Sequence, residues 1–202
     1  MRWQVAASLL MLVGCAAGRI PRIPGDPPPA VRDFDAEREY QRVLERYTSS
    51  QGVYDNLDTK VFFQATWLSP RFVEARVRRE GMFKAWPAAD LEKNLGVERA
   101  RLADATEFFL AVHANDSHHD DFDRRNTMWR MVLMVGGQEL APVSVERIGR
   151  SNTDMRSYYS YMESFWVGYR VRFPKRTLAA GEGFRVKLAS ALGQAELPFT
   201  AE

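Results

Sequence analysis

The sequence predicts a mainly β fold, an immunoglobulin-like antiparallel β-sandwich with an N-terminal helix and two inserted helices. First, seven segments of strand length alternate apolar and polar residues or are apolar on both faces. Second, short turns rather than regular helices join most of the later segments, which favours antiparallel pairing. Third, hydrophobic residues make up 46% of the chain and aromatic residues 12%, which is enough for a packed core. The alternative is an α+β fold, with an antiparallel sheet covered by helices on one face.

Three helices are expected, all in the first half of the chain. Asp35 can cap the first, from residue 36 to about residue 47, because its carboxylate can accept a hydrogen bond from the first turn. The apolar positions of this helix recur at i, i+3, i+4 and i+7 and are Tyr40, Val43, Leu44 and Tyr47. Ser69-Pro70 and Pro87 begin two further helices, which gives a helical insertion at about residues 69–104.

The remaining regular segments are predicted strands. They cover residues 59–68, 108–113, 129–135, 139–148, 165–173, 184–188 and 195–199. The second of them is apolar on both faces and is expected to lie at the centre of a sheet. Gly136-Gly137 predicts a hairpin turn, and Pro142 places the strand after it at a sheet edge. In the fifth, Arg170 and Arg172 alternate with apolar residues and are expected to face solvent.

The first 16 residues carry the most specific motif of the chain. Arg2 precedes an apolar segment, residues 5–13, which is typical of a secretory signal and shorter than the ~20 residues that a membrane-spanning helix needs. Leu12-Val13-Gly14-Cys15 resembles the lipobox of bacterial lipoproteins. The resemblance implies cleavage before Cys15, a diacylglycerol on its sulfur and acylation of the new amine, which together anchor a protein stably. The alternative is an ordinary signal peptide that is cut after Ala17.

The expected organisation of the chain has three parts. Residues 1–14 are the signal peptide, residues 15–34 are the lipidated cysteine with a proline-rich tether, and residues 35–202 are a single β-rich globular domain. Cys15 is the only cysteine of the sequence, so the domain has no disulfide and no thiolate metal ligand. The lipobox resemblance implies a lipid-anchored location in the bacterial cell envelope, and Ala16 in place of Asp favours the outer membrane.

One aromatic and basic segment is a candidate binding surface. Tyrosine, tryptophan and arginine are frequent at interaction hot spots, and aromatic rings also stack on sugars. The candidate residues are Tyr158, Tyr159, Tyr161, Trp166, Arg150 and Arg156. The alternative is that these aromatic side chains belong to the core or cover a loop.

All three histidines follow the predicted central strand closely, beside several aspartates. Imidazole and carboxylate groups suit Zn²⁺, Cu²⁺ or iron. The candidate metal ligands are His113, His118, His119, Asp116 and Asp120. Against this hypothesis, no spacing here matches the HExxH motif, and the alternative is a solvated loop rich in turns. No other cofactor is predicted.

The sequence contains no catalytic signature, since GxSxG, GxGxxG, GxxxxGK and CxxC are all absent. The chain has 28 basic and 26 acidic residues, and loss of Arg2 with the signal leaves an excess of one positive charge, so no nucleic-acid partner is expected. We therefore expect a membrane-anchored envelope lipoprotein that acts as a non-catalytic interaction or structural domain, with an envelope protein or a glycan as partner. The alternatives are a glycan- or peptidoglycan-binding module that uses residues 158–166, and a metal-dependent enzyme that uses the loop 113–123.

Overall fold

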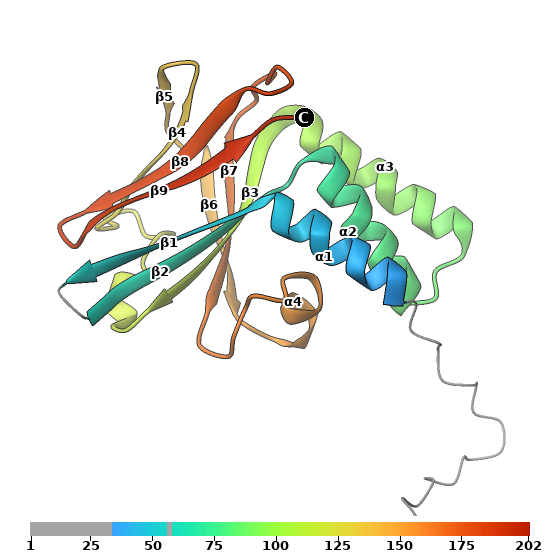
Figure 1. The fold of residues 1–202 in the computed structure, drawn as a ribbon, viewed down its shortest axis with the longest axis horizontal. Coiled ribbons are helices and arrows are strands. Elements are labelled where there is room, and N and C mark those ends of the chain that lie inside the picture. The colour runs from blue at the N-terminus through green and yellow to red at the C-terminus, as the bar shows by residue number, and fades with distance from the viewer. Residues whose placement is uncertain (1–33, 56–57) are drawn as a thin grey trace, which may run out of the picture. The chain divides into compact units, whose positions relative to one another are not determined.

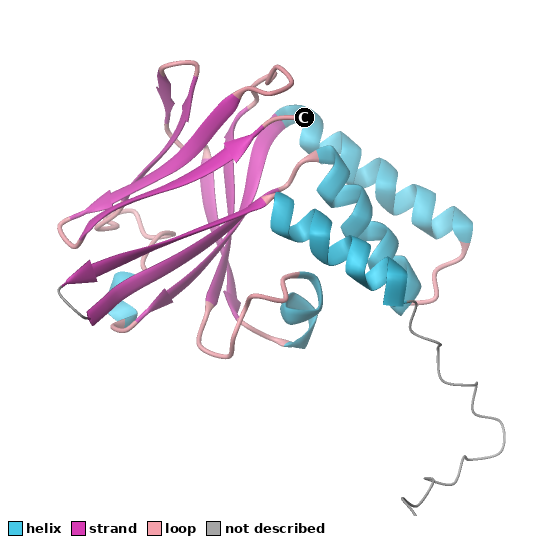
Figure 2. Cartoon of the chain, in the orientation of Figure 1, coloured by secondary structure: helices cyan, strands magenta, loops and turns pink. Residues whose placement is uncertain are grey.

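The structure, a computed structural model, describes residues 34–55 and 58–202 (Figure 1). The predicted signal peptide, Cys15 and the predicted tether lie outside these ranges, apart from Phe34, which begins the first helix. No helix in the described ranges is long and apolar enough to cross a membrane. In chain order the elements, coloured by type in Figure 2, are α1 (Phe34–Arg46), β1 (Thr48–Asp55), β2 (Asp58–Trp67), α2 (Pro70–Phe83), α3 (Ala88–Asp104), β3 (Ala105–Ala114), the 3-10 helix η1 (Ser117–His119), β4 (Arg130–Val135), β5 (Gln138–Leu140), β6 (Ser144–Arg150), α4 (Thr153–Tyr158), β7 (Val167–Pro174), β8 (Gly183–Ser190) and β9 (Gly193–Thr200).

The strands of the described chain form two antiparallel sheets. One has the strand order β1-β2-β3-β7-β6 and the other the order β5-β4-β8-β9. Alternate residues of both sheets meet in one hydrophobic core, which includes Phe63, Phe108 and Tyr169 from the first sheet and Leu133 and Leu197 from the second. The predicted fold class, a mainly β antiparallel sandwich with an N-terminal helix and two further helices, is therefore confirmed.

The helices cover the other face of the five-stranded sheet, and Figure 1 shows α1, α2 and α3 gathered on one side of it. Tyr40 and Leu44 of α1 and Phe72 of α2 join Phe109 and Ala111 of β3 in a second hydrophobic core. The apolar stripe predicted for the first helix is thus buried. β3 is buried on both faces from its first residue to its eighth, as expected for a central strand.

The predicted turn between β4 and β5 is confirmed. Gly136 and Gly137 have φ angles of 54° and 76°, which place both in the left-handed region. A two-residue hairpin of this kind needs such angles at both positions, and glycine adopts them without steric cost.

Two parts of the strand prediction differ from the structure. β1 was not predicted, because Val53 is the only buried residue in it and the strand lacks the apolar alternation of β2. Its position depends instead on backbone pairing with β2. The predicted strand 139–148 is in fact two strands on either side of Pro142. β5 pairs with β4 in one sheet and β6 pairs with β7 in the other, and each lies at an edge.

Candidate ligand pocket

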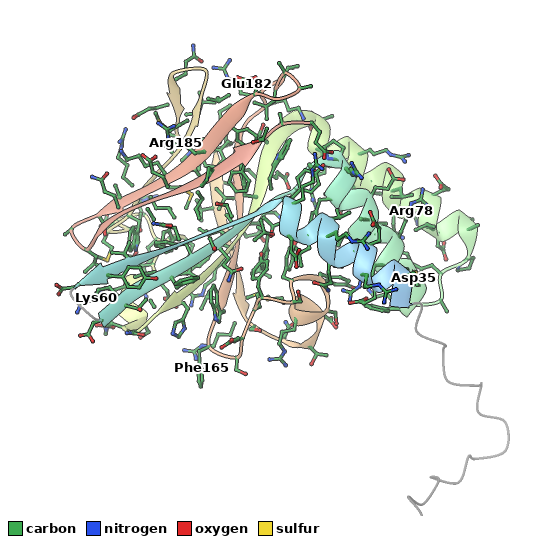
Figure 3. The ribbon with its side chains drawn as sticks, viewed as in Figure 1. Asp35, Lys60, Arg78, Phe165, Glu182 and Arg185 are labelled. Carbon is green, nitrogen blue, oxygen red and sulfur yellow. The ribbon has the colours of Figure 1, made fainter. Side chains whose placement is uncertain are left out.

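The predicted aromatic cluster lies in and after α4, which packs on the helix-covered face of the five-stranded sheet. Tyr159 and Trp166 are only 8% and 7% exposed and belong to the second core, which fits the core interpretation for these two residues. Arg150 and Arg156 are exposed to solvent. Phe165, which Figure 3 labels at the periphery of the fold, is 74% exposed.

Two residues of the cluster, Tyr158 and Tyr159, line a pocket of about 240 Å³. The pocket has lining residues from α2 and α3, from α4, and from strands β3, β6 and β7. Three arginines from separate elements line it as well: Arg76 of α2, Arg101 of α3 and Arg170 of β7. We call this site the arginine pocket.

Part of the pocket lining is apolar. The ring of Phe109 stacks on the ring of Tyr159 with a centroid distance of 3.7 Å and an interplanar angle of 5°. Gly168 of β7 leaves room for this stack, because a Cβ atom there would lie 2.9 Å from Cζ of Phe109. Further apolar lining comes from Leu68, Ile148 and Met155. The pocket therefore combines apolar surface with basic groups.

Two of the three arginines are paired with carboxylates. Arg76 and Arg101 lie 3.2 Å and 2.7 Å from the carboxylate of Glu98. Arg101 also lies 3.0 Å from Glu107, which has no exposed surface. In contrast, within the described ranges no ion pair or hydrogen bond joins the half-buried side chain of Arg170 to another residue. Arg170 therefore brings an uncompensated positive charge to the pocket.

The hydroxyl of Tyr159 interacts electrostatically with all three arginines. Burial raises the pKa of Tyr159, and the charges of Arg76, Arg170 and Arg101 partly oppose this effect. The phenol is therefore protonated at neutral pH and can donate a hydrogen bond. Within the described ranges, no hydrogen bond occupies this hydroxyl. The pocket thus offers a neutral donor next to guanidinium groups.

A second pocket, of about 300 Å³, lies beside α1 and the β1–β2 edge of the sheet. The hydroxyl of Tyr161, which lines it, lies 2.7 Å from Oγ1 of Thr66. Uncharged polar side chains make up most of the remaining lining and are Gln41, Thr48, Ser50, Gln64 and Ser160. We call this site the amide pocket. Apart from Glu45, the hydrogen-bonding side chains that line it are neutral, in contrast to the charged side chains of the arginine pocket.

The candidate metal ligands do not converge on one point. His118 Nδ1 lies 2.7 Å from Oδ1 of Asp116, at an exposed position. Asp120 pairs instead with Arg147, whose Nη2 lies 3.2 Å from Oδ2. Among the described residues, no group of three His, Cys, Asp or Glu side chains is placed to hold a metal ion.

The other two histidines each contact a tryptophan, His113 through its ring and His119 through its backbone carbonyl. The ring of His113 stacks near that of Trp166, with centroids 5.9 Å apart. The backbone carbonyl of His119 accepts a 2.8 Å hydrogen bond from the indole Nε1 of Trp129. These contacts tie the loop to the sandwich, so they support a structural role for it.

The candidate binding residues predicted from the sequence did not include the three pocket arginines, Arg76, Arg101 and Arg170. Arg170 was expected to face solvent, as was Arg172, but Arg170 lines the pocket and Arg172 hydrogen bonds to buried Glu107. Strand alternation identifies the face on which a side chain lies, but not what packs on that face. Glu107 was the residue in the sequence that could have indicated such a partner, because an acidic residue inside an apolar strand requires a buried partner.

Comparison with known proteins assigns no identity to this arrangement. No family model and no curated protein matches the chain. A solved structure that resembles it is a protein of unknown function from Burkholderia pseudomallei K96243, with 8% sequence identity and a TM-score of 0.41. The match covers 82% of this chain and 84% of that protein. At this level the likeness assigns neither a fold family nor a function.

Proposed function

We propose that this chain is a membrane-anchored envelope lipoprotein whose folded domain acts by binding, without catalysis. In this proposal, acylated Cys15 holds the chain at the outer membrane, and the proline-rich tether displays the domain. The observation that carries the binding role is the arginine pocket, which Tyr158 and Tyr159 of the predicted binding segment line. A concave site that combines apolar surface with a few convergent polar groups is typical of small-ligand binding.

The side chains of this pocket are held in place without a ligand. Glu98 positions both Arg76 and Arg101, and the stack of Phe109 on Tyr159 restrains the tyrosine ring. A site whose groups are already ordered loses less conformational entropy when a ligand binds. This preorganisation supports a binding role for the pocket.

Replacement of the lipobox cysteine tests the anchor. In cells fed a clickable fatty acid, Cys15→Ser abolishes labelling, and the matched variant Ala17→Ser remains labelled. Mass spectrometry of the mature wild-type chain finds an acylated N-terminus at residue 15. Persistent labelling of the Cys15→Ser chain, or an unmodified N-terminus at residue 18, contradicts the lipoprotein proposal.

The amide pocket favours a second candidate function, the binding of a glycan such as peptidoglycan. Amide and hydroxyl side chains both donate and accept hydrogen bonds, as sugar hydroxyls require. Tyr161, a residue of the predicted cluster, contributes aromatic surface to the same pocket.

A pull-down on insoluble peptidoglycan tests this second candidate. The full chain is retained, and Gln64→Ala, which removes an amide from the pocket lining, reduces retention. Gln51→Ala is the matched control, because Gln51 is an exposed residue of the neighbouring strand β1 that does not line the pocket. Failure of the unmodified chain to be retained excludes peptidoglycan as the ligand.

A metal-dependent enzyme at the loop 113–123 was the third hypothesis. The described side chains give it no support, because His118 contacts Asp116 while Asp120 pairs with Arg147. Calorimetric titration with Zn²⁺ tests it. A saturable heat that is lost in the double variant His113→Ala/His119→Ala would revive the hypothesis.

A further inference from the structure

We propose that the arginine pocket binds a small organic anion, a carboxylate or a phosphate monoester that carries an aromatic or other apolar group. This inference rests on the proposed binding function and adds the chemical class of the ligand. The anionic group lies against Arg170 and Tyr159. The apolar group lies on the surface that Ile148 and Met155 provide.

The charge of Arg170 is the first reason. A half-buried cation is costly unless an anion or a hydrogen-bond acceptor compensates it. Two acidic residues lie near it in the fold: Asp154 on the pocket lining and Glu146, which is opposite Arg170 in the β6–β7 register. Both are exposed, and neither forms an ion pair with Arg170 in the described structure. A bound anion supplies the missing counter-charge.

The geometry of the donors is the second reason. A guanidinium group donates two parallel hydrogen bonds to a carboxylate or a phosphate. Tyr159 adds an unoccupied phenol, held in place by its stack on Phe109. Arg76 and Arg101 are already paired with Glu98, so carboxylates compensate their charges and leave Arg170 and Tyr159 as the principal donors.

The apolar lining and the size of the pocket are the third reason. A dry apolar cavity of ~150 Å³ accommodates a benzene ring. The volume of about 240 Å³ therefore suits a single ring with one anionic substituent. Ile148, which lines the pocket, is 41% exposed and offers apolar contact to such a ring. Inorganic phosphate alone would leave this surface in water.

The test is a calorimetric titration of the full acylated chain in detergent micelles. The probes are phenylacetate, phenyl phosphate and the uncharged amide phenylacetamide. At least one of the two anions binds at one site, at least about tenfold more tightly than phenylacetamide, and its affinity falls as sodium chloride is added. A preference for phenyl phosphate or for phenylacetate identifies which anionic group the natural ligand carries.

Two variants assign the binding to this pocket. Arg170→Gln and Tyr159→Phe each weaken anion binding by about tenfold or more, because each removes a donor and keeps a similar shape. Arg99→Gln is the matched control, since Arg99 is an exposed arginine of α3 that does not line the pocket. Arg170→Gln keeps its urea midpoint, because Arg170 has no partner to lose among the described residues. If that variant does not fold, Tyr159→Phe alone decides the assignment.

Three results would overturn the inference: equal binding of phenylacetamide, unchanged anion binding in both pocket variants, or no binding of either anion up to about 10 mM. The acylation state of the wild-type chain separates this inference from the proposed function. Anion binding by a wild-type chain that is shown not to be acylated in cells supports the ligand class while the anchor proposal fails. Intact acylation without anion binding overturns the ligand class alone.

Discussion

Arg172 Nε donates a 3.0 Å hydrogen bond to Oε1 of Glu107, a carboxylate with no exposed surface in the most buried strand of the five-stranded sheet. Arg101 of α3 lies 3.0 Å from the other oxygen, Oε2. Glu107 thus links the sheet to a helix that lines the arginine pocket. A buried carboxylate of this kind is tolerated only while its cationic partners remain in place.

We expect Glu107→Ala to lower the free energy of unfolding by about 3 kcal/mol, because Arg172 loses its carboxylate partner and Arg101 loses one of two. Glu107→Gln costs less, since the amide oxygen can still accept one hydrogen bond. Urea denaturation of the purified variants measures both changes. The matched control is Glu196→Ala, which breaks a half-exposed pair with Arg185 and costs less than about 1 kcal/mol. Equal losses in the two alanine variants would contradict the structural role of Glu107.

Gly168→Ala tests the close contact beneath the pocket. The new Cβ atom would lie 2.9 Å from Cζ of Phe109, whose ring is fixed by its stack on Tyr159. We expect a loss of about 1–3 kcal/mol in stability, because the added methyl group forces the ring of Phe109 to shift from its stack on Tyr159. Gly183→Ala is the control, since no atom lies within 4 Å of its added Cβ, and its effect stays within about 0.5 kcal/mol. Urea denaturation measures the change. If Gly168→Ala has the stability of the unmodified chain, the ring is free to move.

Asp121→Ala tests the structural role of the loop after β3. Oδ1 of Asp121 accepts a 2.8 Å hydrogen bond from the Thr127 hydroxyl, and Oδ2 accepts a 3.2 Å bond from the backbone N–H of Met128. Loss of both bonds at this buried site costs about 1–3 kcal/mol. Asp123→Ala removes an exposed carboxylate 3.8 Å from Arg147 and has little effect. Thermal unfolding that ranks Asp123→Ala as the more damaging change would refute this role.

Glu202 makes part of the stability dependent on pH. A hydrogen bond from the hydroxyl of Tyr47 lowers the pKa of its carboxyl, and the charges of Arg46 and Arg71 add to the effect. Because the folded pKa lies below the unfolded value of about 4.3, the contribution is fully present above that value. It is lost as the pH falls through the lowered pKa of the folded chain.

Glu202→Gln is therefore expected to reduce the stability at pH 7 by less than about 1 kcal/mol, because solvent screens this exposed carboxylate, and to have almost no effect near about pH 2. Urea midpoints at the two pH values measure the difference. The exposed Glu163 provides the control through Glu163→Gln, which leaves the midpoint at pH 7 unchanged. If Glu202→Gln loses the same stability at both pH values, the ionisation of Glu202 does not stabilise the fold.

Local patterns were sufficient to predict the sandwich and most of its elements. In β2 and β8 the period of two places apolar side chains on one face, and in α1 the period of 3.6 does the same. Patterns of this kind do not predict an element that is short or that buries few of its residues. β1 contains one buried residue and α4 is only six residues long, so neither carries enough apolar periodicity to be recognised.

The sequence by itself determined most of the strands, the starts of the helices after Ser69 and Pro87, and the choice of Tyr158 and Tyr159 as candidate binding residues. Only the tertiary structure decided that Arg76, Arg101 and Arg170 accompany them, because these three residues are distant in the chain. The β3–β7 register sets Arg170 beside Phe109, and the packing of α2 and α3 on this sheet adds the other two arginines. The physical reason is that backbone periodicity defines the face of each side chain, whereas long-range packing defines what that face meets.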